Sequence, residues 1–272
     1  MKKFLAIAVT AAFSAFGGNA IAQDIPAPTP SGIDNMVGLV FVAVPDYEGS
    51  DDYSGAMGPI LRFKFSGERY FQVLGNKATV NIFAKSRTWE FGPMAVYRGG
   101  RGSGDIDDAV VKLMSDVDDS IELGAFLSYR KDFNGDPRHR MNITLGVTQD
   151  VSGGHDGLVA SLSGVYWTPV SRMFDIGLRG GVQYASDDYM SSNFGVNTAD
   201  SVASGLSPFS AGGGIKDVSL AVMAAVHFSR HWHVGGGIFY KKLVGDASDS
   251  PVVDVRGDDN QLIAGVSILY SW

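Results

Sequence analysis

Apolar and polar side chains alternate along the last fifteen residues of the chain. One face of this stretch carries Leu262, Ala264, Val266, Ile268, Tyr270 and Trp272. Because successive side chains of a strand point to opposite faces, the pattern predicts a β-strand with one apolar surface. Two aromatic residues at the very end are typical of the girdle at a membrane interface. The pattern favours a transmembrane strand over the alternative, a strand that closes a soluble sandwich.

The same alternation recurs along the chain and predicts twelve strands. They are expected over residues 36–44, 59–65, 70–74, 78–84, 89–98, 120–130, 141–147, 158–166, 174–184, 218–228, 232–240 and 258–272. Ten strands is the alternative if residues 70–84 pair differently. An even number of strands brings both ends of a barrel to the periplasmic side.

Loop lengths support this segmentation. The long connections, 45–57, 99–119, 186–215 and 244–259, all follow odd-numbered strands, and every connection after an even-numbered strand is short. All the long loops therefore lie on one side, which in outer-membrane barrels is the outside. The sequence thus predicts an all-β protein, a transmembrane antiparallel up-and-down barrel.

The start of the chain predicts export. Residues 1–22 combine Lys2 and Lys3, an apolar run and small residues before the expected cleavage point, as in a secretory signal peptide. Residues 23–35 are expected to form a flexible periplasmic leader, and residues 36–272 the barrel. The chain has no cysteine, so no disulfide scaffold is expected. Loss of the two lysines changes the formal net charge from -7 to -9, which argues against nucleic acid as a partner.

Charge divides between the two predicted ends of the barrel. The four long loops hold 18 of the 29 acidic residues and only three basic ones, whereas the short turns are rich in Arg and Lys. We expect an acidic outer face, in contact with lipid and lipopolysaccharide, and a basic periplasmic rim. Four basic residues near one turn, Arg130, Lys131, Arg138 and Arg140, are candidates for docking periplasmic partners. The alternative is that these charges only keep the loops solvated.

Few residues suggest catalysis or metal binding. His227, His231 and His233 lie close together near Ser229, but no orienting acid stands beside this serine in the sequence. The aspartates of loop 99–119 lack the Gly and Glu positions of an EF-hand. We therefore expect no enzyme activity, no metal and no cofactor.

Three short motifs resemble the MltA-interacting protein family, also called the MipA/OmpV family, of Gram-negative outer-membrane proteins. They comprise Pro45, Tyr47, Glu48, Gly49 and Ser50; Arg98, Gly99 and Gly100; and Gly245, Asp246, Ala247, Ser250 and Pro251. The resemblance implies an outer-membrane barrel that links a lytic transglycosylase to a penicillin-binding murein synthase. The motifs fall on the predicted outer side, so they are expected to mark barrel architecture, with loops folded inward.

The end of the chain also resembles the C-terminal signal that outer-membrane barrels present to the barrel-assembly machinery. Tyr270 and Trp272, together with Tyr70, are the candidate assembly signal. Predicted lumen positions mix charged residues with bulky apolar ones, which suggests a narrow or plugged lumen. We therefore favour a scaffold that joins the outer membrane to murein-remodelling enzymes over the alternatives, a narrow passive channel or a surface adhesion barrel.

Overall fold

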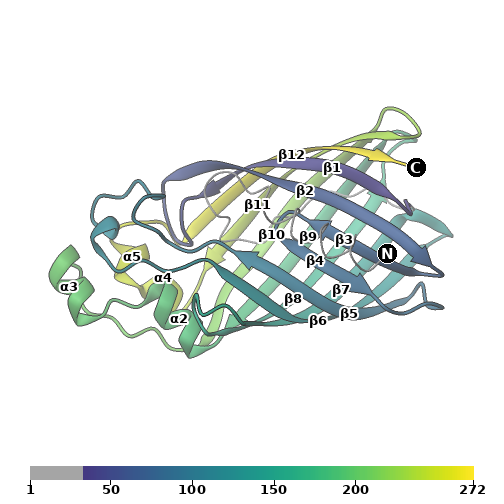
Figure 1. The fold of residues 1–272 in the computed structure, drawn as a ribbon. Coiled ribbons are helices and arrows are strands. Elements are labelled where there is room, and N and C mark those ends of the chain that lie inside the picture. The colour runs from purple at the N-terminus through teal and green to yellow at the C-terminus, as the bar shows by residue number, and fades with distance from the viewer. Residues whose placement is uncertain (1–32) are drawn as a thin grey trace.

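The chain forms a closed antiparallel barrel in which each strand pairs with its neighbours in sequence (Figure 1). A computed structural model describes residues 33–272. The twelve strands are β1 (Met36–Pro45), β2 (Tyr53–Ser66), β3 (Arg69–Leu74), β4 (Lys77–Asn81), β5 (Trp89–Arg98), β6 (Ser120–Phe133), β7 (Asp136–Asp150), β8 (Leu158–Pro169), β9 (Phe174–Ala185), β10 (Gly214–His227), β11 (Trp232–Leu243) and β12 (Asn260–Ser271). This confirms the predicted fold class and strand number.

Pairing of the first strand with the last closes the barrel. Strand β1 runs antiparallel to β12, with Met36 opposite Ser271 and Ala43 opposite Ala264. Closure leaves no unpaired sheet edge, and a sheet that crosses lipid has no water to satisfy such an edge. The alternating C-terminal segment is therefore the strand on which the whole sheet depends.

The two faces of the wall follow the predicted alternation. On β12, Leu262, Val266 and Ile268 are exposed on the outside, whereas Ile263 and Leu269 are buried in the lumen. The lumen is packed along β1, β10, β11 and β12 by apolar side chains that include Val40, Met223 and Phe239. One side of the barrel interior is thus filled rather than open.

Aromatic residues gather at the end of the barrel where the short turns lie. The ring of Trp272 lies 6.2 Å from that of Tyr270 and 6.0 Å from that of Phe63, between centroids. Trp232 also packs against Tyr270. Tyr70 differs from this group, because it is buried in the lumen; its part in the assembly signal stays a prediction.

Helices occur in the long loops, where the sequence predicted only irregular chain. They are η1 (Val111–Leu113), α2 (Asp187–Phe194), α3 (Thr198–Ser204), α4 (Asp246–Asp249) and α5 (Pro251–Asp254). All of them lie at one end of the barrel, beyond the strand ends (Figure 1). Over residues 33–272, no helix is both long and apolar enough to cross a membrane. These short helices lie at and beyond the mouth of the barrel (Figure 1), in connections where the sequence predicted loops without helices.

Several strands are longer than predicted. Strand β2 begins at Tyr53 instead of residue 59, and β10 begins at Gly214 instead of residue 218. In these extensions, exposed Tyr53, Met57 and Ile215 are separated by glycines or followed by the β10 bulge, so the sequence shows no sustained alternation there. The predicted signal peptide and most of the predicted leader lie outside the described residues.

The orientation can be tested with single cysteines, because the natural chain has none. Val202 of α3 is 83% exposed on the helical end, and Arg172 is exposed in the short turn between β8 and β9. On intact cells, we expect a membrane-impermeant maleimide to label Val202→Cys and not Arg172→Cys. Lysed cells should label both, and labelling of Arg172→Cys alone on intact cells would reverse the assigned orientation.

Candidate functional site

The loop between β1 and β2 turns into the barrel instead of projecting outward. Tyr47, Glu48 and Ser50 of this loop are buried, although Tyr47 and Ser50 carry hydroxyl groups and Glu48 carries a carboxylate. The Glu48 carboxylate accepts hydrogen bonds from Lys216 Nζ at 2.5 Å, Lys241 Nζ at 2.9 Å and the Tyr189 hydroxyl at 2.7 Å. One acid from the first loop thus joins β10, β11 and helix α2.

A bulge in β10 brings two consecutive charged residues to the inside. The register of β10 against β9 shifts between Ile215 and Asp217, so Lys216 and Asp217 both become buried. In a regular strand, adjacent side chains point to opposite faces, and a bulge changes that direction locally. Lys216 Nζ also lies 2.7 Å from the Asp217 carboxylate. The bulge therefore places Lys216 beside Glu48, and it places the Asp217 carboxylate beside the same lysine.

The charges of this cluster balance. Glu48 and Asp217 face Lys216 and Lys241, with all four side chains at most 3% exposed. Burial opposes ionisation of Glu48, but the two ammonium groups outweigh it and hold the pKa of its carboxyl well below the usual range. Burial raises the pKa of Tyr189, so its hydroxyl stays protonated and donates to Glu48. We call these four charged residues and Tyr189 the Glu48 network.

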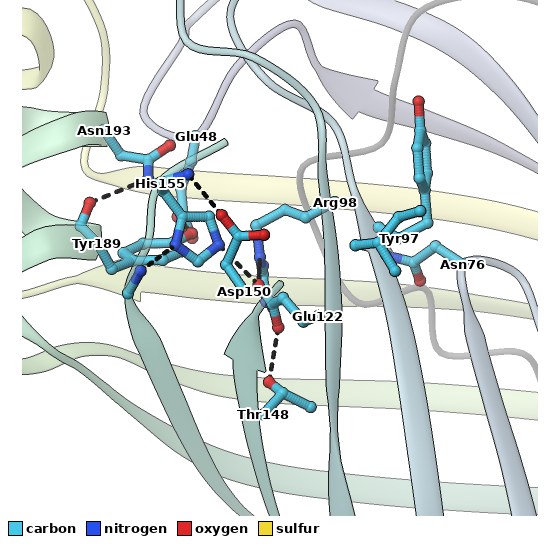
Figure 2. A network of polar contacts seen from close by, with 12 residues as sticks. Glu48, Asn76, Tyr97, Arg98, Glu122, Thr148, Asp150, His155, Tyr189 and Asn193 are labelled. Carbon is cyan, nitrogen blue, oxygen red and sulfur yellow. Dashed lines mark hydrogen bonds and ion pairs between the residues drawn. The ribbon is translucent and has the colours of Figure 1, made fainter. Parts of the chain in front are cut away.

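A second buried ion pair lies beside this network (Figure 2). The Arg98 guanidinium donates to Glu122 at 2.6 Å, and the Thr148 hydroxyl donates to the same carboxylate at 2.6 Å. His155 Nε2 lies 3.1 Å from Glu122, while its Nδ1 accepts the backbone N–H of Gly157. Because Nδ1 accepts, Nε2 carries the proton that His155 donates to Glu122. The loop between β7 and β8 is thereby also tied into the lumen.

The third motif holds the last long loop in the same place. Gly245 precedes α4, and Ala247 is buried in an apolar cluster with residues of α2, α5, β8, β9 and β11. Ser250 caps α5 by accepting from Val252 N, and its hydroxyl donates to Phe194 O at 2.6 Å. Pro251 occupies the first turn of α5, where its missing N–H costs nothing. The motif residues thus build the loop rather than expose a reactive group.

Two motif glycines allow close backbone approach. Gly49 has a φ of 104°, and a Cβ there would lie 2.5 Å from a Val253 methyl group of α5. A Cβ on Gly100 would lie 1.9 Å from the Val117 carbonyl oxygen. Side chains at either position would push the loops apart. The three motifs therefore meet in one structure, the inward-folded end, as the resemblance led us to expect.

Apolar side chains cover these polar networks on the outer side. One cluster joins Tyr189 and Phe194 of α2 to Leu243 and Val253, and another joins Tyr47 to Ile106, Val196 and Val252. Together with the Glu48 network and the Arg98–Glu122 pair, they hold five loops across the helical end of the barrel. We refer to residues 46–52, 99–119, 151–157, 186–213 and 244–259 as the plug.

The four predicted docking residues do not form one surface. Lys131 is exposed on the outside of the wall, and half-buried Arg130 pairs with Asp132 at 2.8 Å. Arg138 pairs with the buried Asp175, and Arg140 is 8% exposed, with its guanidinium 5.7 Å from the centre of the Trp167 ring. Strands β6 and β7 continue beyond the predicted strand ends at residues 130 and 141, and their alternation turns Arg130, Arg138 and Arg140 toward the lumen. Only Lys131 is fully available on the rim.

The histidines form a contact chain that the sequence did not predict. His227 Nε2 lies 2.8 Å from Asp175, His227 Nδ1 lies 2.8 Å from His233 Nδ1, and His233 Nε2 lies 2.9 Å from the Ser271 hydroxyl. An acid thus stands beside His227 rather than beside Ser229. Within residues 33–272, no three His, Asp or Glu side chains are arranged to hold a metal ion.

Sequence reasoning missed Lys216, Tyr189 and His155 as members of the buried networks. Lys216 fell at the border of a predicted loop, and the bulge that turns it inward has no local sequence signal. Tyr189 lies 141 residues from Glu48, its hydrogen-bond partner. A pairing at that distance becomes visible only when the barrel is closed.

Comparison with known families decides the relationship of this chain. The sequence profile of one family, described as MltA-interacting protein MipA, matches residues 37–272. The chain belongs to the MipA family. The match spans every strand of the barrel and all three motifs, and it identifies the protein as an outer-membrane barrel. No curated protein matches the chain in sequence.

Solved outer-membrane barrels are similar only in general shape. The COG4313 outer membrane channel from Pseudomonas putida F1 has a TM-score of 0.47 at 8% identity, over 92% of this chain and 100% of that one. The NanC porin has a TM-score of 0.45 at 11% identity, over 88% of this chain and 100% of that one. Similarity at this level carries no information on the solute or partner of a MipA-family protein.

The Glu48 network makes stability depend on pH. Neutralising Glu48 leaves two buried cations with a single acid, so Glu48→Gln should destabilise the barrel at pH 7 by about 3–5 kcal/mol. Because the folded pKa is depressed, this contribution is complete above the ordinary glutamate pKa of about 4.3 and is lost as the pH falls below it. Thermal melting should therefore show a difference between wild type and Glu48→Gln that shrinks from pH 7 to pH 3.

Asp51→Asn is the matched control, because Asp51 is an exposed acid of the same loop. It should melt within about 0.5 kcal/mol of wild type at pH 7. An equal effect of the two substitutions, or a Glu48→Gln difference that does not change with pH, would contradict the network.

Proposed function

We propose that this MipA-family barrel is a non-enzymatic scaffold that holds murein-remodelling enzymes at its periplasmic end. The observation that supports the proposal most directly is the plug. It covers the helical end of the barrel, so we place the contacts with partner proteins at the periplasmic end. The family name, which refers to an interaction with MltA, supports a lytic transglycosylase as one partner. A penicillin-binding murein synthase is the second partner that the proposal includes.

The periplasmic rim has the charge that such a role requires. Its exposed basic residues come from different turns and strands around the barrel: Lys85, Arg87, Lys131, Arg172 and Arg230. A ring of exposed positive charge attracts acidic protein surfaces and speeds their encounter. We therefore place the docking surface on these five residues. Of the four docking residues predicted from the sequence, only Lys131 belongs to it.

A channel role is disfavoured by the packing of the interior. A passive pore needs a continuous polar path, but buried ion pairs and apolar clusters fill the outer end, and apolar side chains fill one side of the lumen. The contact chain of Asp175, His227, His233 and Ser271 also does not favour an enzyme. Ser271 is 3% exposed, so a substrate could not reach its hydroxyl without rearrangement of the wall.

Charge reversal tests the scaffold. The triple variant Lys131→Glu, Arg172→Glu and Arg230→Glu should still assemble as a heat-modifiable barrel, because these side chains lie outside the lumen. Recovery of the lytic transglycosylase and the penicillin-binding protein from periplasmic extract should fall about tenfold, and raised salt should weaken recovery by wild type in the same way.

The control reverses one charge at the other end of the barrel. Lys112→Glu lies in the plug and should leave partner recovery unchanged. If the triple variant and wild type recover both enzymes equally, or if neither enzyme is recovered by wild type at any salt concentration, the rim is not a docking surface.

A further inference from the structure

The residues just before β1 are held against the inside of the barrel. Ile33 packs against the apolar cluster of the lumen. The Asp34 carboxylate lies 3.0 Å from Lys64 Nζ, and the Asn35 side chain accepts the backbone N–H of Lys64 at 3.0 Å. Lys64 lies near the periplasmic end of β2. The predicted leader is therefore attached to the barrel at the opening of the lumen.

A cavity inside the barrel continues from this point. It has a volume of about 260 Å³, and Tyr70 and Trp167 place it at the periplasmic ends of β3 and β8. Trp167 and Met223 line the cavity and also belong to the apolar cluster against which Ile33 packs. One apolar surface thus leads from Ile33 into the cavity.

The wall of the cavity combines aromatic rings with hydrogen-bond donors. Tyr70, Phe126 and Trp167 contribute the rings. Uncharged donors come from the hydroxyl and amide side chains of Gln72, Thr79, Asn142, Ser161 and Ser163. Grooves lined by aromatic rings bind extended, proline-rich segments. The cavity therefore has the chemistry of a site for such a segment.

Arg62 offers a further donor between Ile33 and the cavity. It lies opposite Met36 in the register of β1 and β2. Its guanidinium is 3.7 Å from the centre of the Tyr70 ring, and its Nη1 donates to Gln72 Oε1 at 2.7 Å. Its Nε is buried and has no hydrogen-bond partner within residues 33–272. A buried donor without an acceptor is costly, so this position suits an occupant that supplies a carbonyl oxygen.

The sequence of the predicted leader matches these requirements. Residues 23–32 include Pro26, Pro28 and Pro30. Proline favours an extended backbone and has no N–H, so this run presents apolar rings and carbonyl oxygens but few donors. Ten residues in this conformation span up to roughly 31 Å. The leader is thus long enough to enter the lumen from Ile33.

We propose that the leader is an internal ligand of the barrel, and that its proline run, residues 26–30, docks in the luminal cavity. The proline rings pack against Tyr70 and Trp167. The backbone carbonyl oxygens accept hydrogen bonds from Arg62 and from the hydroxyl and amide side chains of the wall. This contact goes beyond the scaffold function and does not require it, because it lies in the lumen and not on the rim.

Cross-linking within the full mature chain tests the proposal, because the natural chain has no cysteine. One cysteine replaces Ala27 in the proline run. A second replaces either Ser163 in the cavity or, as the control, Arg172 in the exposed turn that follows the same strand. Docking raises the effective concentration of the two luminal partners, so a short bismaleimide should link Ala27→Cys to Ser163→Cys about tenfold more than to Arg172→Cys. Mass spectrometry of the linked peptides measures both yields.

Replacement of the prolines shows whether they cause the docking. The triple change Pro26→Ser, Pro28→Ser and Pro30→Ser keeps the length and charge of the leader, and it should lower the luminal cross-link about tenfold. Thr29→Ser, in the same run, should leave the cross-link unchanged. Ser161→Cys provides a second luminal position if Ser163→Cys fails to assemble. Equal linkage to the lumen and to Arg172→Cys, linkage to Arg172→Cys alone, or no effect of the triple change overturns the proposal.

Discussion

The ion pairing of Glu48 with Lys216 and Lys241 is the interaction on which the closed end of this barrel depends. A charged group buried without a partner is costly, so the loop that carries Glu48 is stable inside the barrel only when both lysines are present. The lysines face inward only because β10 and β11 are paired and β10 is bulged. Closing the wall and placing the plug are therefore one coupled event.

This coupling gives the two ends of the molecule different roles. At the outer end, three family motifs are used to cap helices, bring backbones together and pair charges, and their reactive groups are buried. At the periplasmic end, the rim displays exposed basic side chains such as those of Arg172 and Arg230. We therefore propose that partners bind at the periplasmic end, although the three motifs lie at the outer end. The motifs build the plug, and the plug leaves the periplasmic end accessible to partners.

The sequence predicted the wall better than the plug for a physical reason. Lipid on one side and packing on the other impose a period of two, which is visible in segments such as 258–272. The plug has no such period, since its contacts join residues far apart, as Glu48 and Lys241 do across 193 positions. Arg140 was expected near an exposed turn but lies buried within β7, because local patterns show that a residue is basic but not whether the strand continues and turns it inward.

Conductance of the purified barrel in a planar lipid bilayer tests the central claim, a plugged outer end, most directly. We expect wild-type protein to insert without producing stable single-channel currents, because packed side chains leave no continuous aqueous path. A steady ohmic current from wild-type barrels at neutral pH, of the size expected for an open twelve-strand pore, would contradict the account.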